Sequence, residues 1–182
     1  MQTTTMRTTS GSVTRVAPDS VRLERVLPAP VERVWDYLVD PALRSTWLAG
    51  GTIDLRPGGI VDLDFDHSRV TPDAQPASSG FEPHHEPGTV VECDPPHLLS
   101  YTWGELWGLS ALVTFQLTPD GEGTRLVILH SQVSDLSVIP DVATGWSGHI
   151  DALEDKLRGG DGTGFWRNFD ALHDRYAREW AS

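Results

Sequence analysis

The chain has 182 residues and a formal net charge of −12, from 26 acidic and 14 basic side chains. One domain is expected, because domains typically hold about 100–200 residues. The acidic balance argues against a protein that binds nucleic acid or anionic membranes, since such binding depends on Lys and Arg side chains that neutralise phosphates.

Cysteine usage and hydropathy indicate a cytoplasmic protein. Cys93 is the single cysteine, so no intrachain disulfide forms and a reducing compartment fits best. Residues 1–20 lack the apolar run of a signal peptide, and no segment approaches the about 18 apolar residues of a membrane span. Residues 1–19 hold few large apolar side chains and are expected to form a flexible N-terminal tail.

The first third of the chain predicts a strand followed by two short helices. A strand is expected over residues 21–26, where apolar and polar side chains alternate. A helix follows, because four apolar residues keep the spacing of one helix face: Val31, Val34, Trp35 and Leu38. Asp40-Pro41 ends it, since the residue before a proline avoids the helical region. A second short helix is expected over residues 43–48.

Five further strands bring the predicted antiparallel sheet to about six. In the first, Val61, Leu63 and Phe65 alternate with aspartates. The others cover residues 89–93, 99–103, 111–117 and 125–130, and their short connections favour an antiparallel meander. If Arg125 faces solvent, then Leu126, Ile128 and His130 share the inward face.

Residues 67–87 interrupt the meander with a long loop that contains four prolines, and we expect either a lid or a disordered segment. We expect no metal ion and no cofactor. The run His84-His85-Glu86, with His67 at the other end of the loop, lacks a chelating spacing. The acidic residues Asp62, Asp64 and Asp66 indicate a solvated strand face rather than a calcium site. Cys93 is expected to be an inert buried thiol, since no neighbouring base or cation is evident.

The last third predicts a long amphipathic helix whose apolar stripe is buried on the concave face of the sheet: Val142, Trp146, His149, Ile150, Leu153 and Leu157. Gly159-Gly160 ends this helix. Gly145 and Gly148 lie inside it, where each costs about 1 kcal/mol relative to Ala. They indicate either a cavity that excludes side-chain bulk or fraying near the start of the helix.

An additional amphipathic helix is expected within residues 161–182, after Thr163 as N-cap. Its apolar face comprises Phe165, Trp166, Phe169, Leu172, Tyr176 and Trp180. This face either packs on the protein's own sheet or docks on a protein partner or a second copy of the chain.

The order of several short motifs resembles the SRPBCC superfamily over residues 20–158, and within it the branch named for the C-terminal domain of the activator of heat-shock-protein-90 ATPase. These motifs are Pro30-Val31-Glu32-Arg33-Val34-Trp35, Asp40-Pro41, Trp47, Arg56-Pro57-Gly58-Gly59, Gly88-Thr89-Val90-Val91-Glu92, the run from Pro95 to Tyr101, Val113-Thr114-Phe115, Gly123-Thr124-Arg125-Leu126, His130 and Gly145-Trp146 before Leu153.

The resemblance implies an α+β helix-grip fold over residues 20–160, similar to START lipid-transfer domains and the birch-pollen allergen. In that fold, a cavity lies between a curved antiparallel sheet and the long C-terminal helix. The 67–87 loop and the helix beyond residue 160 depart from the pattern. Eukaryotic co-chaperones of this branch rely on an additional N-terminal domain to stimulate the chaperone. We therefore do not take the family name to imply that this protein activates a chaperone.

We expect the protein to bind a small hydrophobic or amphipathic molecule in this cavity. The predicted ligand-binding residues are Leu63, Phe65, Val91, Tyr101, Trp103, Trp107, Phe115, His130, Trp146, His149, Ile150 and Leu153. One alternative is an enzyme similar to polyketide cyclases and aromatases, with His130, His149 and Tyr101 as acid–base groups. Another is a co-chaperone or a protein that binds a regulator.

Overall fold

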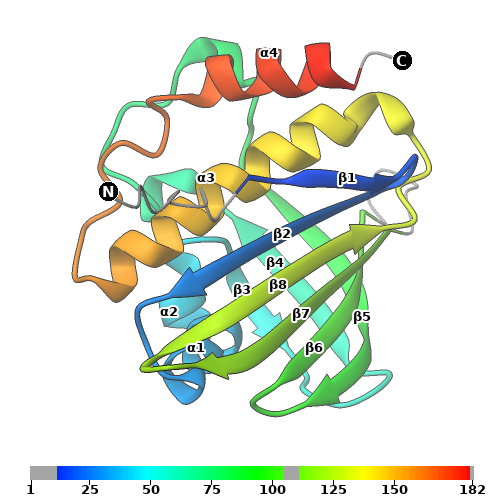
Figure 1. Cartoon of the computed structure of the whole chain (residues 1–182), viewed down its shortest axis with the longest axis vertical. Coiled ribbons are helices and arrows are strands. Elements are labelled where there is room, and N and C mark those ends of the chain that lie inside the picture. The colour runs from blue at the N-terminus through cyan, green and yellow to red at the C-terminus, as the bar shows by residue number, and fades with distance from the viewer. Residues whose placement is uncertain (1–11, 105–110, 181–182) are drawn as a thin grey trace, which may run out of the picture.

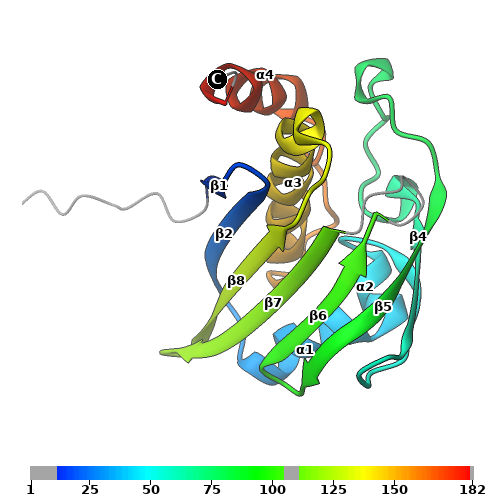
Figure 2. The ribbon, with the colours of Figure 1, turned by 90° about the vertical axis from the view of Figure 1, so that its right-hand side faces the viewer.

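In the computed structural model, which describes residues 12–104 and 111–180, one open antiparallel sheet curves around a long helix (Figures 1 and 2). Its eight described strands lie in the order β1-β2-β8-β7-β6-β5-β4-β3. Their bounds are Thr14–Ala17 (β1), Ser20–Leu27 (β2), Gly50–Ile53 (β3), Ile60–Phe65 (β4), His84–Asp94 (β5), Leu98–Trp103 (β6), Ala111–Asp120 (β7) and Gly123–Ser131 (β8).

The helices lie on the concave side of the sheet and at its ends. Helices α1 (Val31–Val39) and α2 (Pro41–Ser45) follow β2, and the long helix α3 (Ile139–Leu157) follows β8. Helix α4 (Phe169–Glu179) contacts α3 and lies above it in the view of Figure 1. Three short 3-10 helices are described: η1 (His67–Arg69), η2 (Ala77–Ser79) and η4 (Leu136–Val138). This arrangement is the predicted α+β helix-grip fold.

The sheet has two more strands than the sequence predicted. β1 lies within the predicted tail of residues 1–19, where Thr14 pairs with Arg22 of β2. β3 pairs with β4 and contains Gly50 and Gly51. Both strands are only four residues long, which is too short for a clear alternating pattern. In β3, two of the four residues are glycines, which are weak strand formers.

The predicted loop of residues 67–87 is shorter in the structure. Residues 84–87 belong to β5 and pair with β4, despite Pro87. A bulge between Val90 and Glu92 then shifts the register of β5 against β6. Before the bulge, burial alternates through Glu86, Gly88 and Val90, so that Val90 is buried and Val91 is 50% exposed. The expectation that Val91 faces the cavity was therefore wrong, because Val91 continues the outward-facing set of Thr89 and Pro87.

The ends of the helices differ from the predictions at two places. α2 begins at Pro41, and the Asp40 side chain caps it by accepting hydrogen bonds from the backbone of Ala42 and Leu43. α4 begins at Phe169, so Thr163 is not its N-cap. Gly162 and Gly164 have φ of +87° and +97°, a conformation that no helix contains, and the chain turns before α4 starts.

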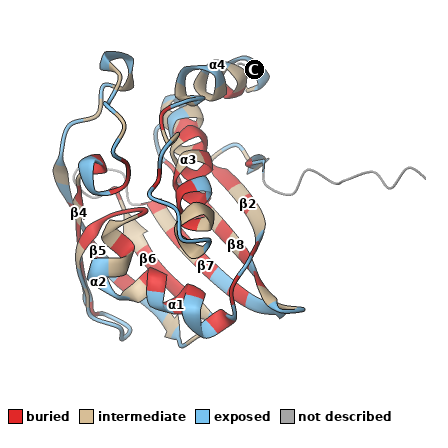
Figure 3. Cartoon of the chain, turned by 90° about the vertical axis from the view of Figure 1, so that its left-hand side faces the viewer, coloured by how far each residue is buried: buried red, intermediate tan, exposed pale blue. Residues whose placement is uncertain are grey.

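The core lies between the sheet and α3, and buried positions line the strands and the helix face between them (Figure 3). The predicted alternation of β8 is present, with Leu126, Ile128 and His130 buried and Arg125 exposed. Among the described residues, no helix is both long and apolar enough to span a membrane.

A buried arginine fixes the segment between α1 and β3. Arg44 is 1% exposed, and its guanidinium donates hydrogen bonds to five backbone carbonyl oxygens, those of Leu38, Val39, Ala49, Gly50 and Gly51. Trp47 is fully buried and donates from Nε1 to the Tyr37 carbonyl at 2.8 Å. These bonds hold the Trp47 backbone in place, and its carbonyl faces α3.

Candidate functional site

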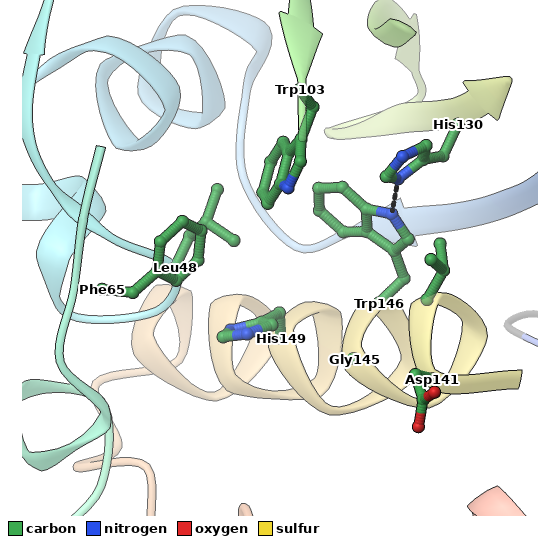
Figure 4. Close-up of a pocket in the computed structure, with 9 residues that line it drawn as sticks. Leu48, Phe65, Trp103, His130, Asp141, Gly145, Trp146 and His149 are labelled. Atoms are coloured by element: carbon green, nitrogen blue, oxygen red, sulfur yellow. Dashed lines mark hydrogen bonds between the residues drawn. The ribbon is translucent and has the colours of Figure 1, made fainter. Parts of the chain in front are cut away.

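A cavity of about 660 Å³ lies between α3, the sheet, the 66–83 loop and the start of α4. A smaller compartment of about 170 Å³ shares much of its lining and reaches Leu48 and Trp146 (Figure 4). A drug-sized ligand typically occupies a pocket of about 300–1,000 Å³. The larger cavity is therefore of the size that holds a small organic molecule.

Five of the twelve predicted ligand-binding residues line these cavities: Phe65, Trp103, His130, Trp146 and His149. Five others lie beneath the lining, each at most 1% exposed: Leu63, Tyr101, Phe115, Ile150 and Leu153. Val91 faces outward on β5. Trp107 lies outside the described residues. Periodicity thus placed side chains on the correct face, but it did not separate cavity lining from packed core.

One wall of the cavity was not predicted from the sequence. The 66–83 loop contributes His67 and Phe81, and the segment before and within α4 contributes Phe165, Trp166 and Phe169. The rings of His67 and Phe81 lie edge to face, with centroids 3.8 Å apart. The signal in the sequence was the aromatic content of the two segments that depart from the family pattern.

The two glycines of α3 face this cavity, well inside the helix. A Cβ atom on Gly145 would meet no atom within 4 Å beyond its own helical turn. A Cβ atom on Gly148 would lie 3.4 Å from a ring carbon of Phe165. Both therefore leave space on the cavity side of α3, and Gly148 lets the Phe165 ring pack against the helix. Fraying does not explain them, because α3 begins at Ile139.

His149 and His67 form a hydrogen-bonded pair on the cavity wall. Nδ1 of His149 lies 2.6 Å from the Trp47 carbonyl, so this nitrogen carries the proton that it donates. In the neutral ring, Nε2 of His149 is then an acceptor. It lies 3.3 Å from Nε2 of His67, which must donate. Nδ1 of His67 is left buried and without a hydrogen-bond partner.

His130 has the opposite tautomer. The indole of Trp146 donates from Nε1 to Nδ1 of His130 at 3.1 Å, and an indole can only donate (Figure 4). In a neutral His130, the proton is therefore on Nε2. The rings of Trp103 and His130 are 5.8 Å apart, and those of Trp103 and Trp146 are 5.6 Å apart. These three side chains enclose one end of the cavity.

Burial keeps all three histidines neutral near pH 7. Burial, with a smaller contribution from the neighbouring His149, lowers the pKa of His67 to about 3. It also lowers the pKa of His130 to about 4. For His149 the pKa falls to about 4 by burial, although the hydrogen bond to Trp47 acts in the opposite direction. Bases this weak are poorly matched to acid–base catalysis at neutral pH.

Tyr101, the third predicted acid–base group, is 1% exposed and does not line the cavity. Burial raises the pKa of its phenol, with a smaller opposing effect from Arg44. Among the residues considered as metal ligands, His85 lies on the outer face of the sheet. Its Nδ1 is 3.3 Å from a carboxylate oxygen of Asp62. The described residues contain no group of three or more His, Cys, Asp or Glu side chains able to hold a metal ion.

Two further predictions concerned the aspartates of residues 62–66 and the thiol of Cys93. The guanidinium of Arg69 forms ion pairs with Asp64 (Nη1 to Oδ2, 2.8 Å) and Asp66 (Nε to Oδ2, 3.5 Å). The acidic strand face is therefore partly neutralised by a cation. Cys93 is half-buried, and burial raises the pKa of its thiol. A thiol with a raised pKa forms little of the reactive thiolate near pH 7.

The apolar face of α4 packs against its own chain, on α3 rather than on the sheet. Tyr176 is 1% exposed, and its hydroxyl lies 3.0 Å from Oγ of Ser147 on α3. Leu172 and Trp180 are partly buried against the core. This face is covered within the described chain, which removes the main argument for its use as a docking helix.

Residues 28–158 match the family described as activator of Hsp90 ATPase homolog 1-like protein. The chain belongs to this family. Membership agrees with the resemblance found over residues 20–158 of the sequence. No curated protein matches.

Solved structures similar to this chain include that of a protein from Bordetella parapertussis, determined by solution NMR. It is 36% identical, with a TM-score of 0.76, and the match covers 91% of this chain and 88% of that one. CalU16 from Micromonospora echinospora is similar in fold, with 23% identity, a TM-score of 0.64, and 90% and 89% coverage. A protein from Rhodobacter sphaeroides has 22% identity, a TM-score of 0.62, and 81% and 97% coverage.

Proposed function

We propose that this protein binds a small, largely apolar molecule in the cavity between α3 and the sheet. The observation that carries the proposal is the cavity of about 660 Å³, whose walls are mainly aromatic and aliphatic side chains. Burial of an apolar ligand against such walls is favourable by about 25 cal/mol per Å² of apolar surface. Gly145 supports the proposal, since it keeps open a space that an alanine could occupy without a clash.

The cost of this open space is a further argument for a function. A glycine inside a helix destabilises it by about 1 kcal/mol relative to alanine. At Gly145 no close packing with another part of the chain explains this cost, because no atom beyond its own helical turn lies within 4 Å of the position of a Cβ. A site for a ligand gives the space a use, whereas a purely structural core would be more stable if it were filled.

The test is to fill the cavity from Gly145. Binding of the fluorescent apolar probe 1-aminoanthracene is measured for the wild-type chain and for Gly145→Ala and Gly145→Leu. We expect saturable binding to the wild type, weaker binding to Gly145→Ala, and at least about tenfold weaker binding to Gly145→Leu.

Ala171→Leu adds a leucine to an exposed position of α4 and serves as the matched control. It should bind the probe as the wild type does. Urea unfolding of each variant confirms that loss of binding is not loss of fold. Wild-type protein that binds no probe, or a Gly145→Leu variant that binds it unchanged, would contradict the proposal.

A further inference from the structure

The polar groups of the cavity narrow the class of ligand. Four described histidines line it: His67, His84, His130 and His149. His67 and His149 bond each other, and His149 also bonds the Trp47 carbonyl. His84 bonds the Glu82 carbonyl through Nδ1, at 2.8 Å. A ligand that bonded the facing nitrogens of His67 and His149 would have to break the bond between them.

His130 offers a hydrogen-bond donor that His67 and His149 do not, since the N–H groups of those two side chains are already bonded. It is 5% exposed, and Trp146 occupies its Nδ1. In the part of the chain that the structure describes, no hydrogen bond is formed by Nε2 of His130, and this atom is not among the sealed polar atoms that lack a partner. Since His130 lines both compartments of the cavity, its Nε2–H is a donor available to a molecule inside.

The charge of the cavity lining restricts which acceptor group a ligand can present to His130. No Lys or Arg is among the described residues that line it, whereas Asp135 and Asp141 are. A carboxylate or phosphate would be buried without a counterion, which costs several kcal/mol. An uncharged carbonyl oxygen avoids this cost and still accepts the hydrogen bond.

The shape and the lining restrict the rest of the ligand. Trp103 and Trp146 lie next to His130, with an angle of 63° between their ring planes. Aromatic rings bind best in stacked or edge-to-face arrangements with other rings. A planar aromatic molecule next to these two tryptophans can place a carbonyl oxygen at His130.

We infer that the cavity selects uncharged, planar aromatic molecules that carry a carbonyl oxygen, through a hydrogen bond from Nε2 of His130. This inference rests on the proposed ligand-binding function and adds the class of ligand. Trp146 is a positioning residue in it, because its indole fixes which nitrogen of His130 carries the proton.

The experiment uses two probes of nearly the same shape. 9-Fluorenone carries a carbonyl, and fluorene lacks it. The affinity of each is measured by displacement of 1-aminoanthracene from the wild type, from His130→Gln and from His130→Leu. Glutamine keeps a donor and an acceptor at this position, whereas leucine removes both. Because one neutral hydrogen bond is worth about 1 kcal/mol, we expect the wild type to prefer 9-fluorenone by about fivefold.

The ratio of the two affinities separates this inference from the proposed function. We expect His130→Gln to keep the preference and His130→Leu to lose it, with fluorene still bound. Equal binding of both probes by the wild type, or a preference that persists in His130→Leu, would overturn the role of His130 and leave ligand binding intact. Displacement by neither probe would overturn the proposed function and this inference together. The wild-type ratio is decisive on its own if His130→Leu fails to fold.

Discussion

His130 and His149 both line the cavity, but they differ in their hydrogen bonds. Both are buried, and burial lowers the pKa of each to about 4. His149 commits both nitrogens within the protein, one to Trp47 and one to His67. His130 commits only Nδ1, to Trp146. A perturbed pKa therefore marks a buried histidine, whereas its hydrogen-bond partners decide whether the ring is available to a ligand.

The largest expected effect is a loss of stability in mild acid, which both histidines share with His67. In the unfolded chain each histidine binds a proton near pH 6.5, whereas in the folded chain it does so only near pH 3–4. Their contribution is therefore complete above about pH 6.5 and is lost as the pH falls toward 4. Between pH 7 and 5 we expect roughly 2 kcal/mol less stability per histidine, measured by urea unfolding.

The variant His130→Gln sharpens this expectation, because it removes one of the three groups. Its unfolding free energy should depend on pH about one third less steeply over the same range. A wild-type stability that stays constant between pH 7 and 5 would contradict the neutral, buried state of these histidines.

The next largest effect separates the two histidines. His149→Leu leaves the Trp47 carbonyl and the His67 N–H without their partner, so we expect the free energy of unfolding to fall by about 3 kcal/mol. His85→Leu is the matched control, since this histidine is exposed on the outer face of β5. It should change stability by about 0.5 kcal/mol or less. A cost for His149→Leu no larger than that of the control would show that its two hydrogen bonds contribute nothing.

A smaller effect is expected from Trp146→Phe, which removes the indole donor. Stability should fall by about 1–2 kcal/mol, through the lost hydrogen bond and the lost ring volume. More informative is the tautomer of His130, measured from the ¹⁵N chemical shifts of its ring. The wild type should carry the proton on Nε2, and the variant should populate both tautomers, while His149 keeps its proton on Nδ1. A mixed tautomer of His130 in the wild type would contradict the positioning role of Trp146.

The smallest expected effect has the opposite sign. Gly145→Ala removes a helix-breaking residue without a clash, so it should stabilise the protein by about 1 kcal/mol. Gly148→Ala should gain less, because its Cβ atom would touch the Phe165 ring at 3.4 Å. Thermal unfolding of the two variants checks this order. A destabilising Gly145→Ala would mean that the space at Gly145 is not open.

Much of the fold was predictable because its main elements have strong periodicity. The stripe of α3 and the alternation of β8 placed His149 and His130 on the inward side. The short strands β1 and β3 gave no pattern to detect. Val91 was predicted to line the cavity, but burial in β5 alternates through Glu86, Gly88 and Val90, and Val91 faces outward.

The candidate site was less predictable, since it depends on contacts between distant segments. His67 meets His149 across 82 positions of sequence, and no local pattern contains that pairing. The positive φ values of Gly162 and Gly164, which delay the start of α4 past Thr163, are likewise imposed by tertiary packing. A Cβ on Gly162 would lie 2.0 Å from the Val70 carbonyl oxygen of the facing loop. The aromatic wall that these segments form therefore emerged only in three dimensions.

The most direct test of a ligand site between α3 and the sheet is to locate a bound probe by NMR. Amide and indole ¹H–¹⁵N resonances are followed while 9-fluorenone is added to the wild-type chain. The largest changes should occur at Gly145, Gly148 and the indoles of Trp103 and Trp146, which surround the cavity. Changes confined to outward-facing positions such as Ile60 and Val91 would place the probe outside the protein and contradict the account.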